Sequence, residues 1–247
     1  MSTKTTMLRT VAAVAAVVVI SISTARSASA ELITGETIAI TEWMYSPSVG
    51  PAEYVEFTNV GTRPIDMTGW SEDDATEKPG HHDLSTFGIV QPGESVIACE
   101  GSDVSGFRSY WGLTSTVEVV AYGTSDNLGR SDEVNLYDST GGLVDRLTFN
   151  DQGSGSVKGP RTQGTGGNVP LADLFQNNAS QTILSVVGDS YHSHHSNFSY
   201  TDGGTGDIGN PGVYTPYVAS PEPSSIALLV AGLVGLLGYA WHKRTQM

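Results

Sequence analysis

Short segments of alternating apolar and polar residues recur along the middle of the chain, separated by glycine, proline, asparagine and aspartate. Residues 54–59 show the pattern, because Val55 and Phe57 would lie on one face of an extended strand and Glu56 and Thr58 on the other. Comparable segments occupy residues 38–45, 65–70, 87–90, 94–99, 117–122, 133–137 and 143–149. Many short strands with turn residues between them are typical of an all-β sandwich.

The alternation also predicts which side chains pack between the two sheets. We expect the core to contain Val55, Phe57, Ile65, Met67, Trp70, Val96, Val134, Leu136, Val144 and Leu147. Residues 138–142 tolerate a positive φ, so the strands on either side of them are expected to form a hairpin.

One helix and one buried cysteine complete the expected interior. Val104, Phe107 and Trp111 fall on one stripe of a helix, which predicts a short helix over residues 103–111. Cys99 is the single cysteine, so no intrachain disulfide can form. It lies in an apolar segment, and we expect it to pack in the core rather than act as a nucleophile.

The N-terminal end of the chain has the three regions of a secretory signal peptide. Lys4 and Arg9 precede an apolar run at residues 11–20. Small residues follow, and Ala28 and Ala30 form an A-x-A cleavage pattern directly before Glu31. Residues 1–30 are therefore expected to form a signal helix that is removed on export.

The C-terminal end carries a second apolar run of different character. Residues 226–241 are apolar, which at ~1.5 Å per residue is short for a hydrocarbon core of ~30 Å but long enough for a thin bilayer. Lys243 and Arg244 would hold the C-terminus in the cytoplasm. Pro221, Glu222 and Pro223 precede the run, and the prolines prevent a helix from continuing outward.

Residues 221–247 resemble the PEP-CTERM sorting signal of exported Gram-negative proteins, with its Pro-Glu-Pro motif, short transmembrane segment and basic end. The resemblance implies an exosortase as processing partner, which removes the anchor and passes the protein to the cell surface or extracellular matrix. An inner-membrane intermediate would precede that step. The alternative is an ordinary C-terminal membrane anchor that is retained.

The body between the two ends is strongly acidic. Removal of the charged residues of both ends leaves 25 acids and 7 bases in residues 31–220, a net charge of −18. Such a surface repels nucleic acid and anionic membranes, and it favours divalent cations or cationic polymers. A nucleic-acid-binding function is therefore excluded.

The middle of the chain resembles the lamin-tail domain, an immunoglobulin-like β-sandwich found in nuclear lamins and in secreted bacterial proteins. The matching segments, in order and spacing, are residues 40–47, 53–59, 65–70, 91–94, 132–138 and 142–145. Residues 130–132 depart from the family, which usually has a glycine there, and this makes the turn before the penultimate strand less favourable. The family has no catalytic residues, so the resemblance implies a non-enzymatic structural, adhesive or binding module.

The region after residue 151 is expected to complete the same domain. Residues 152–168 are rich in glycine and predict a loop or linker. Residues 169–212 contain core-like segments, and their last six residues are similar to the ending of exported bacterial members of the family. We therefore expect a sandwich over residues 31–212 and a spacer over residues 213–220.

Histidines offer one candidate for chemistry. His81 and His82 lie in one loop and His192, His194 and His195 in another, which allows a metal-dependent secreted hydrolase as an alternative function. A metal centre needs three or four ligands that converge from rigid elements. Both clusters lie in Ser/Gly/Asp-rich stretches, so solvated loop histidines are the simpler interpretation.

Acidic loops offer a second candidate. Asp126, Asp132, Asp202 and Asp207 could supply oxygen ligands for Ca²⁺, although their spacing does not match an EF-hand. This would make the protein a calcium-stabilised polysaccharide-binding module. Apart from possible calcium we expect no cofactor, and exopolysaccharide or other matrix components are the expected partners.

Overall fold

The computed structural model describes residues 37–48, 50, 52–124, 127–196 and 206–215. The signal helix and the C-terminal transmembrane helix expected from the sequence both lie outside these residues. Within the described residues no helix is long and apolar enough to cross a membrane.

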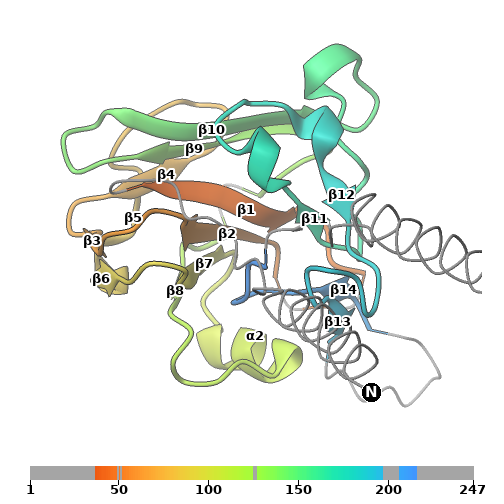
Figure 1. Ribbon diagram of the computed structural model, residues 1–247, viewed down its shortest axis with the longest axis horizontal. Coiled ribbons are helices and arrows are strands. Elements are labelled where there is room, and N and C mark those ends of the chain that lie inside the picture. The colour runs from red at the N-terminus through yellow and green to blue at the C-terminus, as the bar shows by residue number, and fades with distance from the viewer. Residues whose placement is uncertain (1–36, 49, 51, 125–126, 197–205, 216–247) are drawn as a thin grey trace, which may run out of the picture. The chain divides into compact units, whose positions relative to one another are not determined.

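The larger of two sheets has six strands in the order β12-β11-β1-β2-β7-β8 (Figure 1). Neighbouring strands are antiparallel except for β7 and β8, which are parallel. Its strands are β1 (Ile38–Met44), β2 (Tyr54–Asn59), β7 (Ser95–Cys99), β8 (Val119–Ala121), β11 (Gly167–Asn168) and β12 (Ile183–Leu184).

The smaller sheet has four antiparallel strands in the order β10-β9-β4-β5, and two-stranded ribbons β3–β6 and β13–β14 flank the sheets. These strands are β4 (Ser71–Asp73), β5 (His82–Asp83), β9 (Ser131–Tyr137), β10 (Leu143–Asn150), β3 (Ile65–Asp66), β6 (Ile89–Val90), β13 (His194–His195) and β14 (Ile208–Gly209). The predicted all-β fold class is confirmed.

Helical elements in the described residues are short. The one α-helix is α2 (Val104–Trp111), which confirms the predicted helix. The 3₁₀ turns are η1 (Ser85–Phe87), η2 (Gly155–Val157), η3 (Leu171–Asp173) and η4 (Ala179–Gln181).

The main core lies between the two sheets. Eight of the ten predicted core residues are buried there, and the other two, Trp70 and Val144, are partly buried against the same cluster. Trp43 of β1 stacks on Phe149 of β10 with ring centroids 4.0 Å apart, which joins the sheets directly. The predicted inward-facing positions are therefore confirmed.

A second, smaller core lies on the other side of the six-stranded sheet. Phe107, Tyr110 and Trp111 of α2 pack against a cluster that includes Tyr54 and Cys99. Asp103 begins the helix by accepting a hydrogen bond from the Gly106 N–H, and Gly112 ends it in the left-handed conformation. Burial raises the pKa of the Cys99 thiol to about 12, so the predicted packing role is confirmed.

The hairpin β9–β10 forms around the predicted turn. Asp138 accepts hydrogen bonds from the Thr140 and Gly142 N–H groups at 2.8 and 2.9 Å, and Gly141 takes a φ of 79°. At the start of β9, where the family usually has glycine, none of residues 130–132 has a positive φ. The Arg130 guanidinium pairs with Asp151 at 2.8 Å across the hairpin, so this end closes without the glycine.

The segment expected as one strand over residues 65–70 is only partly extended. Ile65 and Asp66 form β3, and the chain then turns, with the Trp70 N–H donating to the Met67 carbonyl. The Asp66 carboxylate accepts a hydrogen bond from the Thr68 N–H at 3.0 Å, and Gly69 has a φ of 78°. This side-chain-stabilised turn ends the strand.

The glycine-rich segment, expected as a loop over residues 152–168, differs from that expectation at its end. Gly167 and Asn168 form β11, which pairs with β1 through Trp43 and Glu42. Both β11 residues are buried. A Cβ at Gly167 would come within 2.7 Å of the Thr182 side chain, so glycine is required by close packing and not by flexibility.

Candidate functional site

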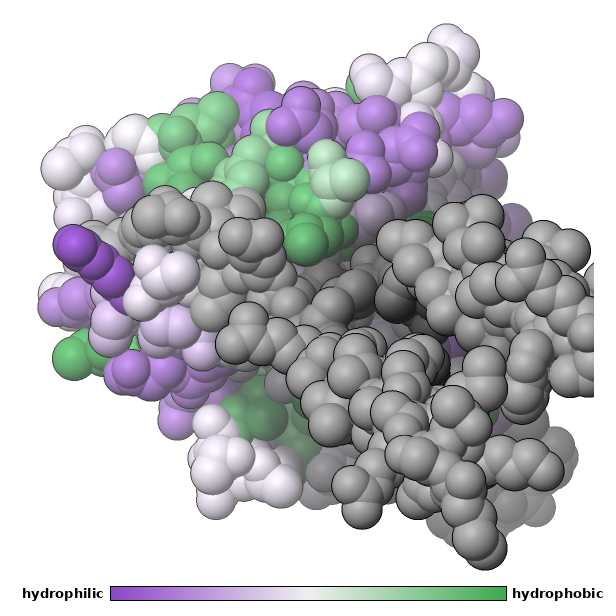
Figure 2. Space-filling view, in the orientation of Figure 1, coloured by the Kyte–Doolittle hydropathy of each residue, from purple (hydrophilic) through white to green (hydrophobic). Residues whose placement is uncertain are grey.

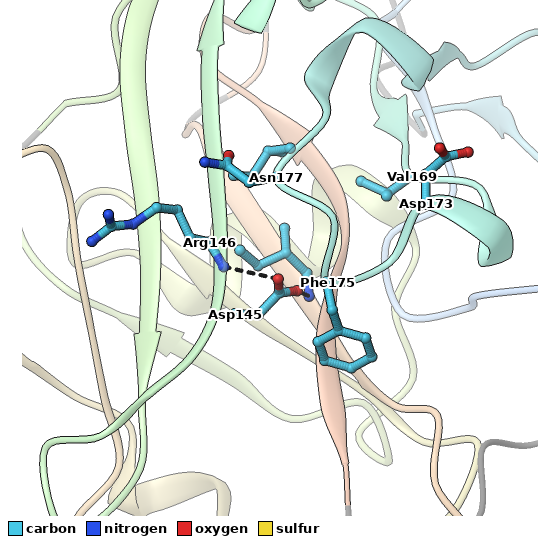
Figure 3. A pocket seen from close by; sticks show the side chains of 8 residues that line it. Asp145, Arg146, Val169, Asp173, Phe175 and Asn177 are labelled. Carbon is cyan, nitrogen blue, oxygen red and sulfur yellow. Dashed lines mark hydrogen bonds between the residues drawn. The ribbon is translucent and has the colours of Figure 1, made fainter. Parts of the chain in front are cut away.

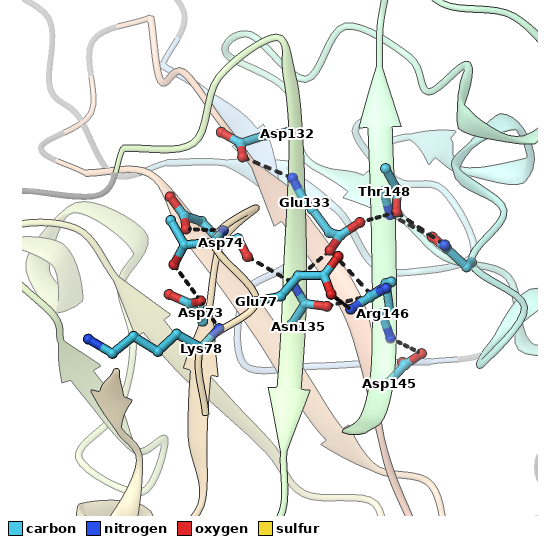
Figure 4. A network of polar contacts seen from close by, with 12 residues as sticks. Asp73, Asp74, Glu77, Lys78, Asp132, Glu133, Asn135, Asp145, Arg146 and Thr148 are labelled. Atoms are coloured by element: carbon cyan, nitrogen blue, oxygen red, sulfur yellow. Dashed lines mark hydrogen bonds and ion pairs between the residues drawn. The ribbon is translucent and has the colours of Figure 1, made fainter. Parts of the chain in front are cut away.

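A network of polar side chains covers the outward face of the β9–β10 hairpin (Figure 4). Glu133 lies opposite Thr148 and Asn135 opposite Arg146, so the four side chains share one face of the two strands. Glu133 accepts hydrogen bonds from the Thr148 hydroxyl at 2.6 Å and from the Asn135 amide at 2.9 Å. The Arg146 Nε lies 3.2 Å from Glu133, so this buried carboxylate is paired and fixed.

The loop between β4 and β5 lies against this network. The Asn135 amide donates to the Asp74 carbonyl at 2.8 Å, and the Arg146 guanidinium pairs with Glu77 at 3.0 Å. Asp73 accepts hydrogen bonds from the Thr76 hydroxyl and the Lys78 N–H, which closes the loop. Glu77 has a φ of 53°, a conformation that a non-glycine residue rarely adopts and that often marks a binding site.

An open pocket of about 270 Å³ lies beside the hairpin, the β4–β5 loop and η2. Its lining residues are Ala75, Glu77, Ser131, Asp132, Glu133, Thr148, Phe149, Asn150 and Val157. Asp132 is half-buried, and burial raises the pKa of its carboxyl. With three carboxyl groups and three neutral polar side chains in its lining, the pocket suits a ligand that donates hydrogen bonds or carries an amine.

A second pocket, next to Asp145, is too small for a ligand. Its volume of about 10 Å³ is close to the minimum for one water molecule (Figure 3). The Asp145 carboxylate accepts hydrogen bonds from the Ile40 and Arg146 N–H groups, each at 2.8 Å. Burial raises the pKa of Asp145 to about 6. Because Ile40 belongs to β1 and Asp145 to β10, this carboxylate joins the two sheets and has a structural role.

Two fully buried glutamates lie on the other side of the six-stranded sheet. Glu42 of β1 accepts hydrogen bonds from the Asn210 N–H at 3.1 and 3.3 Å, and Glu56 of β2 accepts one from the Gly212 N–H at 2.7 Å. The Thr41 hydroxyl also donates to Glu56 at 2.7 Å. These carboxyl groups hold residues 207–214, which we call the closing segment, against the first two strands.

Burial sets the charge state of this pair. Burial and the neighbouring Glu56 raise the pKa of Glu42 well above its usual value. Burial raises the pKa of Glu56 to about 7, although its hydrogen-bond donors oppose the rise. Burial therefore disfavours the charged form of both glutamates, most strongly that of Glu42.

The closing segment also approaches the sheet too closely for side chains. A Cβ at Gly209 would lie 2.7 Å from the Tyr54 hydroxyl and 3.1 Å from Glu42 Oε1. At the start of the segment, Asp207 accepts hydrogen bonds from the Ser48 and Gly50 N–H groups and from the Tyr110 hydroxyl at 2.7 Å. The segment is thus fastened at both the sheet and the helix.

The predicted calcium ligands are only partly visible. Asp207 is the first residue of the closing segment, and both of its carboxylate oxygens accept hydrogen bonds from protein donors. Asp132 lies at the pocket and accepts hydrogen bonds from the Gly129 and Glu133 N–H groups. Asp126 and Asp202 lie outside the described residues, so the calcium hypothesis stays a prediction.

The two histidine clusters lie apart, on β5 and β13 (Figure 1). His81 contacts Asp73 at 2.6 Å and His82 contacts Glu72 at 2.8 Å, and the two histidine rings stack on each other.

The second histidine cluster has different contacts. The rings of His194 and Trp111 pack in a T-shaped arrangement. His192 has a φ of 64°, and His195 lies 3.3 Å from the Gly206 carbonyl. Within the described part of the chain, no three His, Cys, Asp or Glu side chains form a group that could hold a metal ion.

Sequence reasoning missed the buried glutamates. Glu56 was placed on the face opposite the main core, and the strand pattern gives no sign that α2 and the closing segment cover that face. The buried polar set is satisfied internally, because Thr41, Glu56 and Thr58 form hydrogen bonds to one another across two strands.

The fold defines a β-sandwich built of two main sheets, with its buried carboxyl groups in structural roles. Residues 33–151 match the Lamin Tail Domain family, and residues 221–244 match the PEP-CTERM protein-sorting motif. The chain therefore carries a lamin tail domain followed by an exosortase sorting signal, as the two sequence resemblances indicated. Searches of curated proteins and of solved structures find no match.

Several conclusions follow from these two matches. The sorting motif marks an exported protein that passes through the membrane to the cell surface or extracellular space, and it implies processing by an exosortase. The lamin tail domain is an immunoglobulin-like structural domain and not a known enzyme family. Ala28, Ala30 and Glu31, together with the individual sorting residues Pro221, Glu222, Pro223, Lys243 and Arg244, lie outside the described residues, so their roles stay predictions.

Proposed function

We propose that the exported body is a non-enzymatic binding module, and that the pocket beside the β9–β10 hairpin binds a neutral or amine-bearing polymer of the extracellular matrix. The observation that carries this proposal is the pocket itself, about 270 Å³ in volume and lined by Glu77, Asp132 and Glu133. This volume is close to the lower end of small-ligand sites, about 300 Å³.

The surroundings of the pocket support recognition rather than catalysis. Glu133 and Asn135 are held on a long hairpin by hydrogen bonds to neighbouring side chains, which gives a fixed arrangement of polar groups. The carboxyl groups disfavour acidic polysaccharides and favour hydroxyl and amine donors. Figure 2 shows hydrophobic residues gathered on one part of the visible face, among hydrophilic ones.

We further propose that residues 226–241 anchor the precursor in the inner membrane until exosortase processing. The support is the match of residues 221–244 to the sorting motif and the basic Lys243 and Arg244 at its end. The mature protein would then lack this anchor.

Binding by the mature protein recovered from the cell surface tests the pocket. Affinity for neutral, amine-bearing and acidic polysaccharides is compared for the wild type, Glu133→Gln and the matched control Glu118→Gln. Glu118 is an exposed acid that does not line the pocket. We expect Glu133→Gln to lower affinity at least about fivefold, equivalent to ~1 kcal/mol, and Glu118→Gln to leave it unchanged.

Two further outcomes separate the alternatives. If chelation of divalent cations lowers both the affinity for the polysaccharide and the thermal midpoint of the protein, a calcium-stabilised module is supported, because an ion bound only by the native state stabilises that state. Metal-dependent turnover of a glycan, phosphoester or peptide that is lost when His192, His194 and His195 are all changed to alanine would overturn the non-enzymatic proposal.

A further inference from the structure

Exposed aliphatic side chains surround the point where the chain leaves the folded body. Val186 and Val187 are 63% and 49% exposed at the tip of a turn, and Val213 in the closing segment is 50% exposed. We call these three residues the valine patch. No charged residue occurs in residues 183–187 or 211–214.

Hydrogen bonds connect the two turns that carry the valine patch. The Gly188 N–H donates to the Ser193 carbonyl at 2.9 Å, and the Ser193 hydroxyl lies 3.1 Å from Asn210 Oδ1. The Asn210 amide in turn donates to the Val213 carbonyl at 2.8 Å. The turn at Val186 and the end of the closing segment are therefore neighbours on one part of the surface.

The chain after Tyr214 is too short to let this surface move far from the anchor. The Tyr214 hydroxyl donates to the Val169 carbonyl at 2.8 Å, and the side chain is buried. From Tyr214 to Ile226, the first residue of the apolar run, is 12 residues, which span at most about 40 Å when fully extended. A folded body of this size is itself about 40 Å across, so the exit side cannot face directly away from the anchor and the valine patch stays within reach of the membrane.

We propose that the valine patch docks on the outer surface of the lipid bilayer in which the C-terminal segment is inserted. The inference rests on the proposed membrane anchoring of the precursor. Apolar side chains enter the boundary between headgroups and acyl chains when they are exposed beside a membrane. Because the body is acidic, the docked lipid surface is zwitterionic, and anionic lipid weakens the contact.

The docking would hold the Pro-Glu-Pro motif close to the bilayer while the precursor awaits processing. After cleavage the tether is lost, and a contact of three side chains does not by itself retain an acidic protein at a membrane. The valine patch therefore acts only in the anchored precursor, and release follows from removal of the anchor.

Depth-dependent quenching on the full chain tests this proposal. Single cysteines at positions 186, 213, 89 and 230 carry an environment-sensitive fluorophore, and the protein is inserted in phosphatidylcholine vesicles with brominated acyl chains. Cys99 is buried and is not labelled in the folded protein. Ile89 of β6 is the matched control, because it is 61% exposed but lies at the other side of the body from β12 (Figure 1).

We expect Val186→Cys and Val213→Cys to lose at least about half of their fluorescence to the brominated lipid, and Ile89→Cys to lose little. Val230→Cys, within the apolar run, reports insertion of the anchor separately. If position 230 is quenched while positions 186 and 213 behave like position 89, docking is wrong and anchoring stands. If position 230 is not quenched, the anchoring proposal fails and docking fails with it.

Discussion

Substitution of Glu42 tests whether the buried glutamates are neutral in the folded protein. Glu42 is fully buried and accepts hydrogen bonds from the Asn210 N–H and the Ser185 hydroxyl. Glu42→Gln keeps a carbonyl oxygen and nearly the same shape without a charge. Glu42→Ala removes the carboxyl group, so the Asn210 N–H and the Ser185 hydroxyl lose their hydrogen-bond acceptor.

The structure sets the expected magnitudes. Each of the two unsatisfied buried donors costs about 1–3 kcal/mol, and the lost Cγ methylene adds ~0.8 kcal/mol, so Glu42→Ala should lower the free energy of unfolding by at least about 3 kcal/mol. If the carboxyl is protonated, Glu42→Gln should change stability by less than about 1 kcal/mol at pH 5. At pH 8 the variant should be more stable than the wild type.

The pH dependence follows from the direction of the pKa shifts. The folded-state pKa values of Glu42 and Glu56 lie above the pKa of an unfolded glutamate. At a pH between the unfolded and folded pKa values, the folded protein therefore binds more protons than the unfolded chain. Their contribution to stability is complete below about pH 4.5 and falls as pH rises through the folded pKa, which for Glu56 is about 7. Each proton contributes a slope of up to about 1.4 kcal/mol per pH unit.

Urea unfolding at pH 5, 6, 7 and 8, followed by tryptophan fluorescence, measures these effects. Glu53 and Asp145, whose pKa values are also raised, contribute to the wild-type slope, so the comparison is the difference between wild type and Glu42→Gln at each pH. A Gln variant as unstable as the Ala variant at pH 5, or a wild type that gains stability up to pH 8, would refute the reasoning.

Three further outcomes are expected. Phe57→Ala should lower the free energy of unfolding by about 3–5 kcal/mol in a denaturation experiment, since the ring is fully buried, and little change would contradict the assigned core. Gly209→Ala should lower the free energy of unfolding by about 1–3 kcal/mol, because the new methyl group would overpack against Tyr54. Gly80→Ala is the comparison variant: its methyl group would meet open space, so any loss of stability there reports the strain of a positive φ alone. Intact-mass measurement of surface protein should show a chain that begins at Glu31 and has lost everything after about Pro221 or Pro223. Retention of residues 241–247 would indicate a permanent anchor.

Local patterns predicted the parts of the fold that depend on neighbouring residues. The alternation around Val55 and Phe57 identified the core face, and the apolar stripe of Val104 and Phe107 identified α2, because burial on one face imposes a period on the sequence. These features need no knowledge of distant segments.

Contacts between distant segments could not be predicted in the same way. Gly167 and Asn168 have little β propensity, and they form a strand because β1 offers them an antiparallel partner. The pocket likewise combines β9, β10, the β4–β5 loop and η2, which no single motif links. Glu56 accepts a hydrogen bond from Gly212, a residue more than 150 positions later, so part of its burial depends on a distant segment.

The long separation between Glu42 and Asn210 has a consequence for export. Their hydrogen bond joins residues 168 positions apart, so the first strand finds its last partner only when almost the whole body is available. Contacts of such high sequence separation form late and slowly. In a secretion that begins at the predicted signal peptide, the body would reach its native state only after Asn210 has crossed the membrane. The complete sandwich therefore closes only when the segment just before the sorting signal is present.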